Sequence, residues 1–179
     1  MAALRTVHTA DLDTNDRHTV RQLLDAAYDD DFADEDWDHT LGGMHVLAAV
    51  DGAVVAHVAV VQRRLWHRGM SIRTGYVEAL AVGRDRRRQG VAAALMGEAE
   101  RLIRSAYDLG ALSDGTNIEG FYERRGWQAW HGCTSVISPT GVLRTEEDDE
   151  TVMVLPTPTS PSLDVSGLIA CDWRPGDVW

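Results

Sequence analysis

The most informative stretch of the sequence is Arg87-Arg88-Gln89-Gly90-Val91-Ala92, which lies between a strand-like segment at 72–82 and an amphipathic segment at 91–107. Backbone amides at the start of a helix form a concave anion site, and the helix dipole strengthens it. Gly90 has no side chain, so a phosphate can approach the main chain there. The motif alone also fits a solvated basic turn capped by glycine. Its place between a strand and a long helix favours a phosphate-binding turn.

Outward from this turn, the pattern of apolar residues predicts a mixed α+β chain. Asp13 is a good N-cap for the first helix, and Asp51-Gly52 is the strongest hairpin turn signal. Residues 156–166 are rich in Pro, Ser and Thr and should be irregular. The other expected elements are strands at 4–9, 44–50, 53–65, 72–82, 109–112, 127–138 and 151–155 and helices at 15–28, 91–107 and 117–125.

Length and composition indicate one soluble globular domain. The chain has 179 residues and is 44% hydrophobic, which is enough for one buried core and short for two, so we expect a single domain over residues 1–179. No apolar run reaches the roughly 18 residues of a membrane span, and the first residues lack a secretory pattern. Cys133 and Cys171 are expected to be buried free thiols. These features predict a cytoplasmic protein that does not bind membranes.

The charge distribution excludes some partners and suggests another. The formal net charge is −11, so nucleic acid is not expected to bind. The seven histidines show no metal-ligand spacing, and we expect no metal. Acidic residues gather at 29–36, at 146–150 and near the end of the chain; most such residues are solvated, but a few could bind a polycation. Against this background, four arginines gather in the turn at Arg84, Arg86, Arg87 and Arg88.

A second motif completes a family pattern. The turn, together with Asn117-x-x-x-Phe121-Tyr122-x-x-x-Gly126-Trp127, resembles the two motifs of the GNAT acetyltransferases over residues 76–127. The resemblance implies a GNAT fold, with a mixed, mostly antiparallel central sheet, a splayed strand and flanking helices. It also implies acetyl-CoA or CoA as the ligand. The corresponding CoA-binding residues are Leu80, Val82, Arg87, Arg88, Gln89, Gly90, Val91, Ala92 and Asn117.

Other segments resemble one branch, the aminoglycoside 2′-N-acetyltransferases of actinobacteria. These segments include residues 36–45, Gly75-Tyr76-Val77-Glu78 and the final run Cys171-Asp172-Trp173-Arg174-Pro175-Gly176-Asp177-Val178-Trp179. The branch implies acetylation of the 2′-amine of aminoglycoside antibiotics, resistance to them, and a homodimer. The acceptor-binding residues implied are Asp31, Asp36, Glu78, Ser113, Asp148, Asp177 and Trp179.

Acetyl transfer to an amine needs a base for the ammonium proton and an acid for the departing thiolate. The resemblance assigns these roles to Glu78, acting through water, and to Tyr122. A carboxylate on an apolar strand is costly unless it faces water or a cavity, which agrees with the first assignment. From the residues alone, Glu78 could instead be an ordinary solvent-facing side chain, and Tyr122 could serve aromatic packing.

The last residues suggest a tail that packs onto the domain. Two tryptophans, Trp173 and Trp179, lie in the last seven residues, whereas most chain ends are polar and frayed. A docked tail would bring the terminal carboxylate of Trp179 to the acceptor; the alternative is a tail buried between subunits. Two alternative functions also remain: acetylation of another polyamine, an amino-sugar metabolite or a protein N-terminus, and regulation by a non-catalytic acyl-CoA-binding protein.

Overall fold

The structure, a computed structural model, describes residues 2–29, 31–115 and 120–179 and has the mixed α+β architecture expected. The chain forms two compact units, Met1–Val61 with Val77–Leu102, and Gln62–Tyr76 with Ile103–Trp179. Three long elements contribute to both units: β3 (Ala53–His67), β4 (Met70–Val82) and α3 (Val91–Ala106). In the described part of the chain, no helix is long and apolar enough to cross a membrane.

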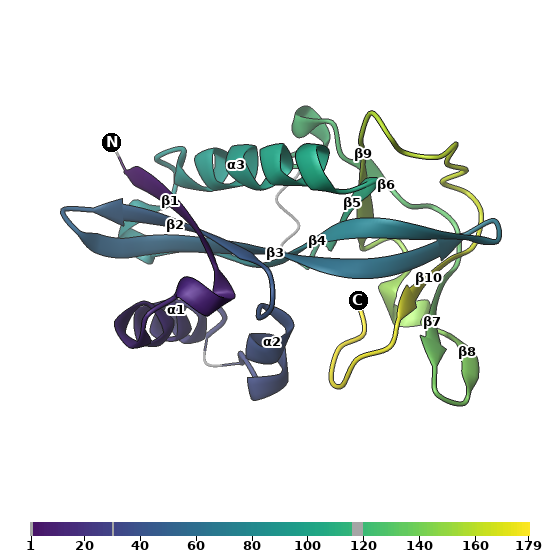
Figure 1. Ribbon diagram of the computed structural model, residues 1–179, viewed down its shortest axis with the longest axis horizontal. Coiled ribbons are helices and arrows are strands. Elements are labelled where there is room, and N and C mark those ends of the chain that lie inside the picture. The colour runs from purple at the N-terminus through teal and green to yellow at the C-terminus, as the bar shows by residue number, and fades with distance from the viewer. Residues whose placement is uncertain (1, 30, 116–119) are drawn as a thin grey trace. The chain divides into compact units, whose positions relative to one another are not determined.

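The first unit is an antiparallel sheet with helices on both faces (Figure 1). The strand β1 (Ala3–His8) pairs with β2 (Met44–Val50), which pairs with β3. Asp51 and Gly52 have φ of 51° and 82° and form the predicted hairpin turn. The helices of this unit are η1 (Thr9–Asp11), α1 (Thr14–Ala27), α2 (Asp34–His39), η2 (Arg84–Arg86) and the first part of α3.

Helix α1 confirms its prediction closely. The Asp13 side chain accepts a hydrogen bond from the amide of Asp16 at 2.7 Å and so caps the first turn. Val20 and Leu24, four positions apart, are fully buried. They form a core with Leu47 of β2 and Ala81 of β4. Burying the apolar stripe of α1 therefore anchors this helix against the sheet.

The second unit joins segments that are far apart in the sequence. Residues Thr74–Tyr76 of β4 pair in parallel with β5, while β5 pairs antiparallel with β9 and β9 with β6. On the other side, β10 pairs antiparallel with β3 and in parallel with β7, which pairs with β8. The bounds are β5 (Leu109–Ser113), β6 (Gln128–Ala129), β7 (Thr134–Ser138), β8 (Gly141–Arg144), β9 (Val152–Pro156) and β10 (Ile169–Asp172).

Several late elements differ from the sequence prediction. Residues 157–168 are irregular as expected, β10 lies in the tail that follows them, and the expected strand at 127–138 is split into β6 and β7. Cys171 is buried as expected, whereas Cys133, which precedes β7, is exposed. The expected helix at 117–125 lies partly outside the described residues. Its described part holds η3 (Glu123–Arg125), which Gly126 ends in the left-handed conformation at φ 94°. The remaining short helix is η4 (Glu146–Asp148). Strands of two to five residues carry too little periodicity to be recognised locally.

A close backbone crossing in the second unit makes one glycine indispensable. A Cβ atom at Gly132 would lie 1.9 Å from the carbonyl oxygen of Gly167. We expect Gly132→Ala to lower the free energy of unfolding by about 1–3 kcal/mol, because the two backbones must separate. Urea denaturation measures this. Gly115→Ala is the matched control, since a Cβ there meets nothing within 4 Å. Equal stabilities of the two variants would contradict the crossing.

Candidate active site

The predicted phosphate-binding turn connects the end of β4 to the start of α3. Arg88 and Gly90 have left-handed φ values of 62° and 80°. A Cβ built on Gly90 meets nothing within 4 Å, so the space beside it is open. The amide of Ala94 bonds to the carbonyl of Gly90 at 3.1 Å; the amides of the first helical turn before it have no acceptor within the helix. The turn therefore offers backbone donors to an anion at a helix N-terminus.

The polar side chains of the turn serve its shape more than the sequence suggested. Arg87 donates from Nε to the carbonyl of Val82 at 3.2 Å, and Gln89 donates from Nε2 to the carbonyl of Asp85 at 2.9 Å. Arg84 pairs with Asp29, at 2.5 Å between Nη2 and Oδ1. Two of the predicted CoA ligands thus brace the turn through their side chains. Their main-chain groups remain the better candidates for phosphate contact.

Glu78 is a half-buried residue of β4 in the first unit. Its negative charge, together with that of Asp36, acts on Tyr28 at the C-terminal end of α1. Partial burial is the larger cause, and the three effects together raise the pKa of Tyr28 to about 12. The charges of Glu78 and Asp36 thus act on the same tyrosine. Tyr28 was not predicted from the sequence, although its place between a helix end and an acidic run was a signal.

The other two acidic residues of this unit that are predicted to bind the acceptor follow Tyr28 in the chain. Asp36 accepts a hydrogen bond from the amide of Ala33 at 2.9 Å, which holds the start of α2. Asp31 is exposed, and its amide bonds to the carbonyl of Tyr28 at 3.0 Å. That Asp31 and Asp36 bind the acceptor remains a prediction.

Tyr122, the predicted acid, belongs to the second unit and is only 5% exposed. Its ring meets Phe121 and Trp127 edge-on, with centroids 5.0 and 6.0 Å away. These contacts fix the ring in an aromatic cluster. Its catalytic role stays a prediction, and Asn117 lies outside the described residues.

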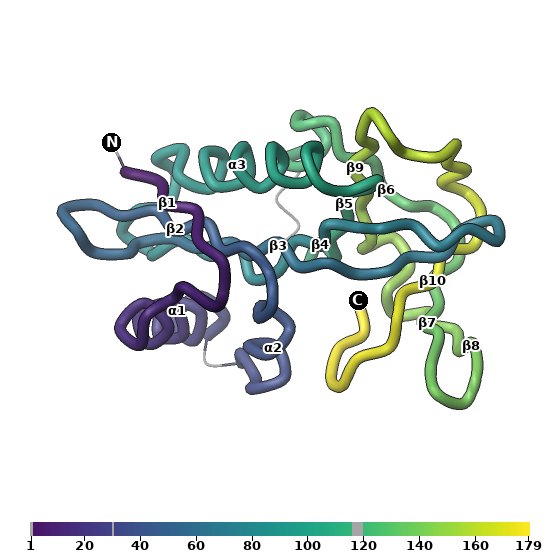
Figure 2. The backbone as a smooth tube through the Cα atoms, viewed as in Figure 1, coloured from purple at the N-terminus to yellow at the C-terminus, as the bar shows by residue number. Residues whose placement is uncertain are grey.

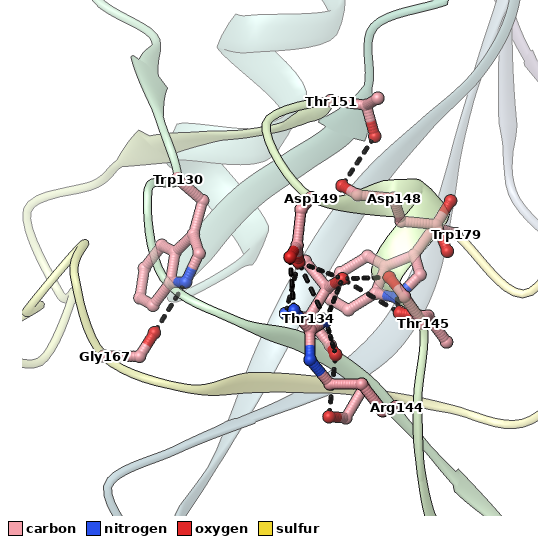
Figure 3. A network of polar contacts seen from close by, with 10 residues as sticks. Trp130, Thr134, Arg144, Thr145, Asp148, Asp149, Thr151, Gly167 and Trp179 are labelled. Atoms are coloured by element: carbon pink, nitrogen blue, oxygen red, sulfur yellow. Dashed lines mark hydrogen bonds and ion pairs between the residues drawn. The ribbon is translucent and has the colours of Figure 1, made fainter.

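The acidic loop at 146–150 contains one carboxylate with a structural role (Figure 3). Asp149 forms an ion pair with Arg144 and accepts hydrogen bonds from the amide and hydroxyl of Thr134, at 3.0 and 2.9 Å. Arg144 is the main reason why the pKa of Asp149 lies far below its ordinary value. Asp149 therefore joins β7 to the loop.

Its neighbour Asp148 lies in a different electrostatic environment. Burial, followed by the charges of Asp177 and Glu147, raises the pKa of Asp148 to about 6. These three acidic residues line one cavity of about 320 Å³, together with Trp173. A cluster of like charges that opposes its own ionisation is well suited to bind a cation, which would relieve the repulsion.

The final residues of the chain turn back beside β10 within the second unit (Figure 2). Trp179 is 3% exposed, and its indole donates to the hydroxyl of Thr145 at 3.0 Å. The Trp179 amide donates to Asp177 Oδ1 at 3.2 Å, and Arg174 Nη2 donates to the main-chain oxygen of Trp179 at 2.9 Å. These bonds place Asp177 beside the acidic loop.

Ser113 is connected to the same loop through Thr151. Its hydroxyl donates to Thr151 Oγ1 at 3.0 Å, and Thr151 Oγ1 donates to the carbonyl of Asp148 at 2.9 Å. The second unit thus brings together four of the predicted acceptor residues, which are Ser113, Asp148, Asp177 and Trp179. The first unit holds Asp31, Asp36 and Glu78. In the described ranges, no three His, Cys, Asp or Glu side chains are grouped to hold a metal.

Asp148→Asn should make stability less dependent on pH. The pKa of this carboxyl rises from 3.8 to about 6 on folding. The folded state then binds the proton more tightly than the unfolded state. The protonated carboxyl therefore adds to the free energy of unfolding below pH 4, and this addition is lost as the pH rises through about 6. The free energy of unfolding of the variant, relative to that of the parent protein, should rise by on the order of 1–3 kcal/mol between pH 4 and pH 7.5. Urea denaturation at both pH values measures the difference.

The neighbouring substitution Asp149→Asn is the control with the opposite sign. The pKa of Asp149 is lowered, so this carboxylate stabilises the fold above its unfolded pKa, and its loss should destabilise the protein at neutral pH. A difference between Asp148→Asn and the parent that does not change with pH would contradict the environment described for Asp148.

The chain is similar to known acetyltransferases. The "Acetyltransferase (GNAT) family" pattern matches residues 11–127. An aminoglycoside 2′-N-acetyltransferase of Mycolicibacterium fortuitum is 51% identical over 177 residues, which cover 98% of this chain and 91% of that protein.

Solved structures agree on the fold. The GNAT-family N-acetyltransferase YhbS of Escherichia coli, in complex with CoA, superimposes with a TM-score of 0.66 and is 20% identical; the match covers 94% of this chain and 88% of that one. A GNAT-family acetyltransferase of Brucella melitensis, in complex with acetyl-CoA, has a TM-score of 0.63 and 18% identity, with 95% of each chain covered.

Proposed function

The chain belongs to the GNAT acetyltransferase family, and from this premise we propose that it transfers the acetyl group of acetyl-CoA to the 2′-amine of aminoglycosides and so gives resistance to them. The observation that carries the proposal is its 51% identity, over nearly the whole chain, to a protein named for this activity. The acidic cavity of the second unit supports it, because an aminoglycoside carries several ammonium groups that carboxylates bind well.

The turn before α3 fits the diphosphate of CoA. Gly90 leaves open space beside the main chain, and the first amides of α3 point out of the helix. In this proposal the main chain of 87–92 binds the diphosphate, while the strand residues Leu80 and Val82 bind the pantetheine arm through their backbone. Bound acetyl-CoA supplies an activated acetyl thioester.

Glu78 and Tyr122 would act as the general base and the general acid of the acetyl transfer. Glu78 takes a proton from the acceptor ammonium through water, which frees the nitrogen lone pair to form a bond to the acetyl carbon. As the carbon–sulfur bond breaks, Tyr122 gives a proton to the leaving thiolate, and the second proton lost by the attacking nitrogen returns to Tyr122 through water. Glu78 is half-buried on β4, and its charge acts on Tyr28 together with that of Asp36.

We propose that Asp148, Asp177, Trp179 and Ser113 bind the acceptor, and that Asp31, Asp36 and Glu78 are acceptor ligands as well. The raised pKa of Asp148 supports this, because binding an ammonium group would favour its ionised form.

A thiol-release assay with acetyl-CoA tests the proposal. The panel pairs aminoglycosides that carry a 2′-amine with analogues that carry a 2′-hydroxyl, and adds spermidine, glucosamine and a peptide with a free N-terminus. Turnover is expected with the 2′-amines, with the acetyl group found on that nitrogen by NMR. If only another member of the panel is acetylated, that compound class, and not the aminoglycosides, is the acceptor. CoA binding without any turnover would favour a regulator.

Two further properties are part of the proposal. We propose that the protein works in the cytoplasm, where the acetyl-CoA pool is available, and that it forms a homodimer. Light scattering after size-exclusion chromatography measures the mass in solution. A monomeric mass at micromolar concentration would contradict the proposed dimer.

A further inference from the structure

Two fully buried histidines of the first unit lie side by side on neighbouring strands, and the proposed chemistry does not use them. His45 lies on β2 and His57 on β3, and both are 0% exposed. His45 Nδ1 and His57 Nε2 are 2.9 Å apart, and the ring centroids are 5.2 Å apart. A buried polar pair of this kind needs all its hydrogen bonds satisfied.

The far end of the pair decides which nitrogens carry protons. His57 Nδ1 lies 3.0 Å from the carbonyl oxygen of Ala79, which can only accept, so Nδ1 must be protonated. The neutral His57 ring then accepts at Nε2 from His45 Nδ1. His45 in turn accepts at Nε2 from the hydroxyl of Thr9, at 2.8 Å. A single directed chain therefore runs from Thr9 through both rings to Ala79.

The surroundings keep both rings neutral. Burial, followed by the charges of Arg17 and His8, lowers the pKa of His45 to about 4. Burial, followed by His45, lowers the pKa of His57 to about 3, and the bond to Ala79 opposes this only in part. Protonation of His57 would place two donors, His57 Nε2 and His45 Nδ1, opposite each other and break the chain. The chain should thus remain intact throughout the neutral and mildly acidic range.

The residue held by this chain has an unusual backbone. Ala79 has φ of 50°, in the left-handed region that is unfavourable for residues with a Cβ atom. Such a conformation costs about 1–3 kcal/mol and persists only where its surroundings impose it. Ala79 lies inside the strand β4, in a half-buried stretch at residues 78–80 that follows the buried residues 74–77.

We propose that the His45–His57 pair is a positioning element for catalysis: it holds the Ala79 carbonyl, maintains the left-handed turn in β4, and so fixes where the Glu78 carboxylate and the Leu80 amide point. This inference rests on the proposed function, because Glu78 is the base there. A displacement of about 1 Å at a reacting group can cost a hundredfold in rate, so a buried pair behind the strand can control turnover without touching the substrate.

Two substitutions of His57 separate positioning from simple packing. His57→Leu fills the space but removes the donor, whereas His57→Asn keeps an N–H near the position of Nδ1. We expect His57→Leu to lower kcat about tenfold to a hundredfold, with the KM for acetyl-CoA changed less than about twofold, and to alter the pH–rate profile in the limb that reports Glu78. His57→Asn should recover most of kcat. Equal losses in both variants, or an unchanged kcat in folded His57→Leu, would overturn the proposal.

A measurement on the unmutated full-length chain keeps the inference testable if a variant fails to fold. Nitrogen-15 NMR of the imidazoles should show both rings neutral and protonated at Nδ1 from pH 7.5 down to about 5. An Nε2–H tautomer or an imidazolium at His57 in this range would refute it. The result does not depend on any acceptor. If no amine is acetylated but the tautomers are as expected, the function proposed above has failed and the hydrogen-bond chain has not.

Discussion

Glu78→Gln should lower kcat/KM for a 2′-amino aminoglycoside about a hundredfold at pH 7, and by much less near pH 9. General-base catalysis contributes about 10² to 10⁴ in rate. Glutamine keeps the size of the side chain but cannot take the proton from the ammonium group. At high pH the free amine is abundant, so the missing base matters less. Steady-state rates over this pH range, at saturating acetyl-CoA, measure the effect.

Asp36→Asn is the matched control for this variant. It also removes a negative charge that acts on Tyr28, but it leaves Glu78 in place. We expect it to raise the KM of the acceptor while preserving the shape of the pH–rate profile. If Glu78→Gln keeps the profile of the parent enzyme, bulk water or another carboxylate takes the proton, and the assignment of Glu78 as base is wrong.

Gly90→Asp should weaken CoA binding at least tenfold, and up to about a hundredfold. The substitution adds a side chain and a negative charge beside the amides that are proposed to bind the diphosphate. A tenfold loss corresponds to about 1.4 kcal/mol of binding free energy. Isothermal titration with CoA measures the dissociation constant directly, without an acceptor.

Strain must be separated from electrostatic repulsion in this experiment. Gly52 has φ of 82°, compared with 80° at Gly90, and a Cβ at either position meets nothing within 4 Å. Gly52→Asp thus introduces the same charge and similar backbone strain in the β2–β3 turn. It should lower stability about as much as Gly90→Asp while leaving CoA affinity unchanged. Equal CoA affinities in the two variants would remove the diphosphate from this turn.

Local signals were sufficient for the parts of the fold that are stabilised locally. The Asp13 cap, the Asp51-Gly52 turn and the unit of strand, basic turn and helix before α3 were predicted because each depends on residues within a few positions of one another. The family resemblance rested on the same turn, and the family match and the fold confirm it.

The candidate site depended more on tertiary structure. The sequence presents Asp148 and Asp149 as adjacent and equivalent members of an acidic run. Packing sets them apart, because Arg144 of β8 pairs with one while the other is buried close to Asp177. Tyr28 likewise is connected with Glu78 and Asp36 only in the folded chain, where the charges of both act on it.

By itself, the sequence thus determined the fold class, the family and the turn that joins β4 to α3. Tertiary structure alone decided that β10 pairs with β3 and β7, that His57 reaches the carbonyl of Ala79, and which carboxylates share a cavity. The physical reason is distance along the chain. Turns and caps form between neighbouring residues, whereas these contacts join segments tens to a hundred positions apart, whose pairing depends on the packing of the rest of the protein.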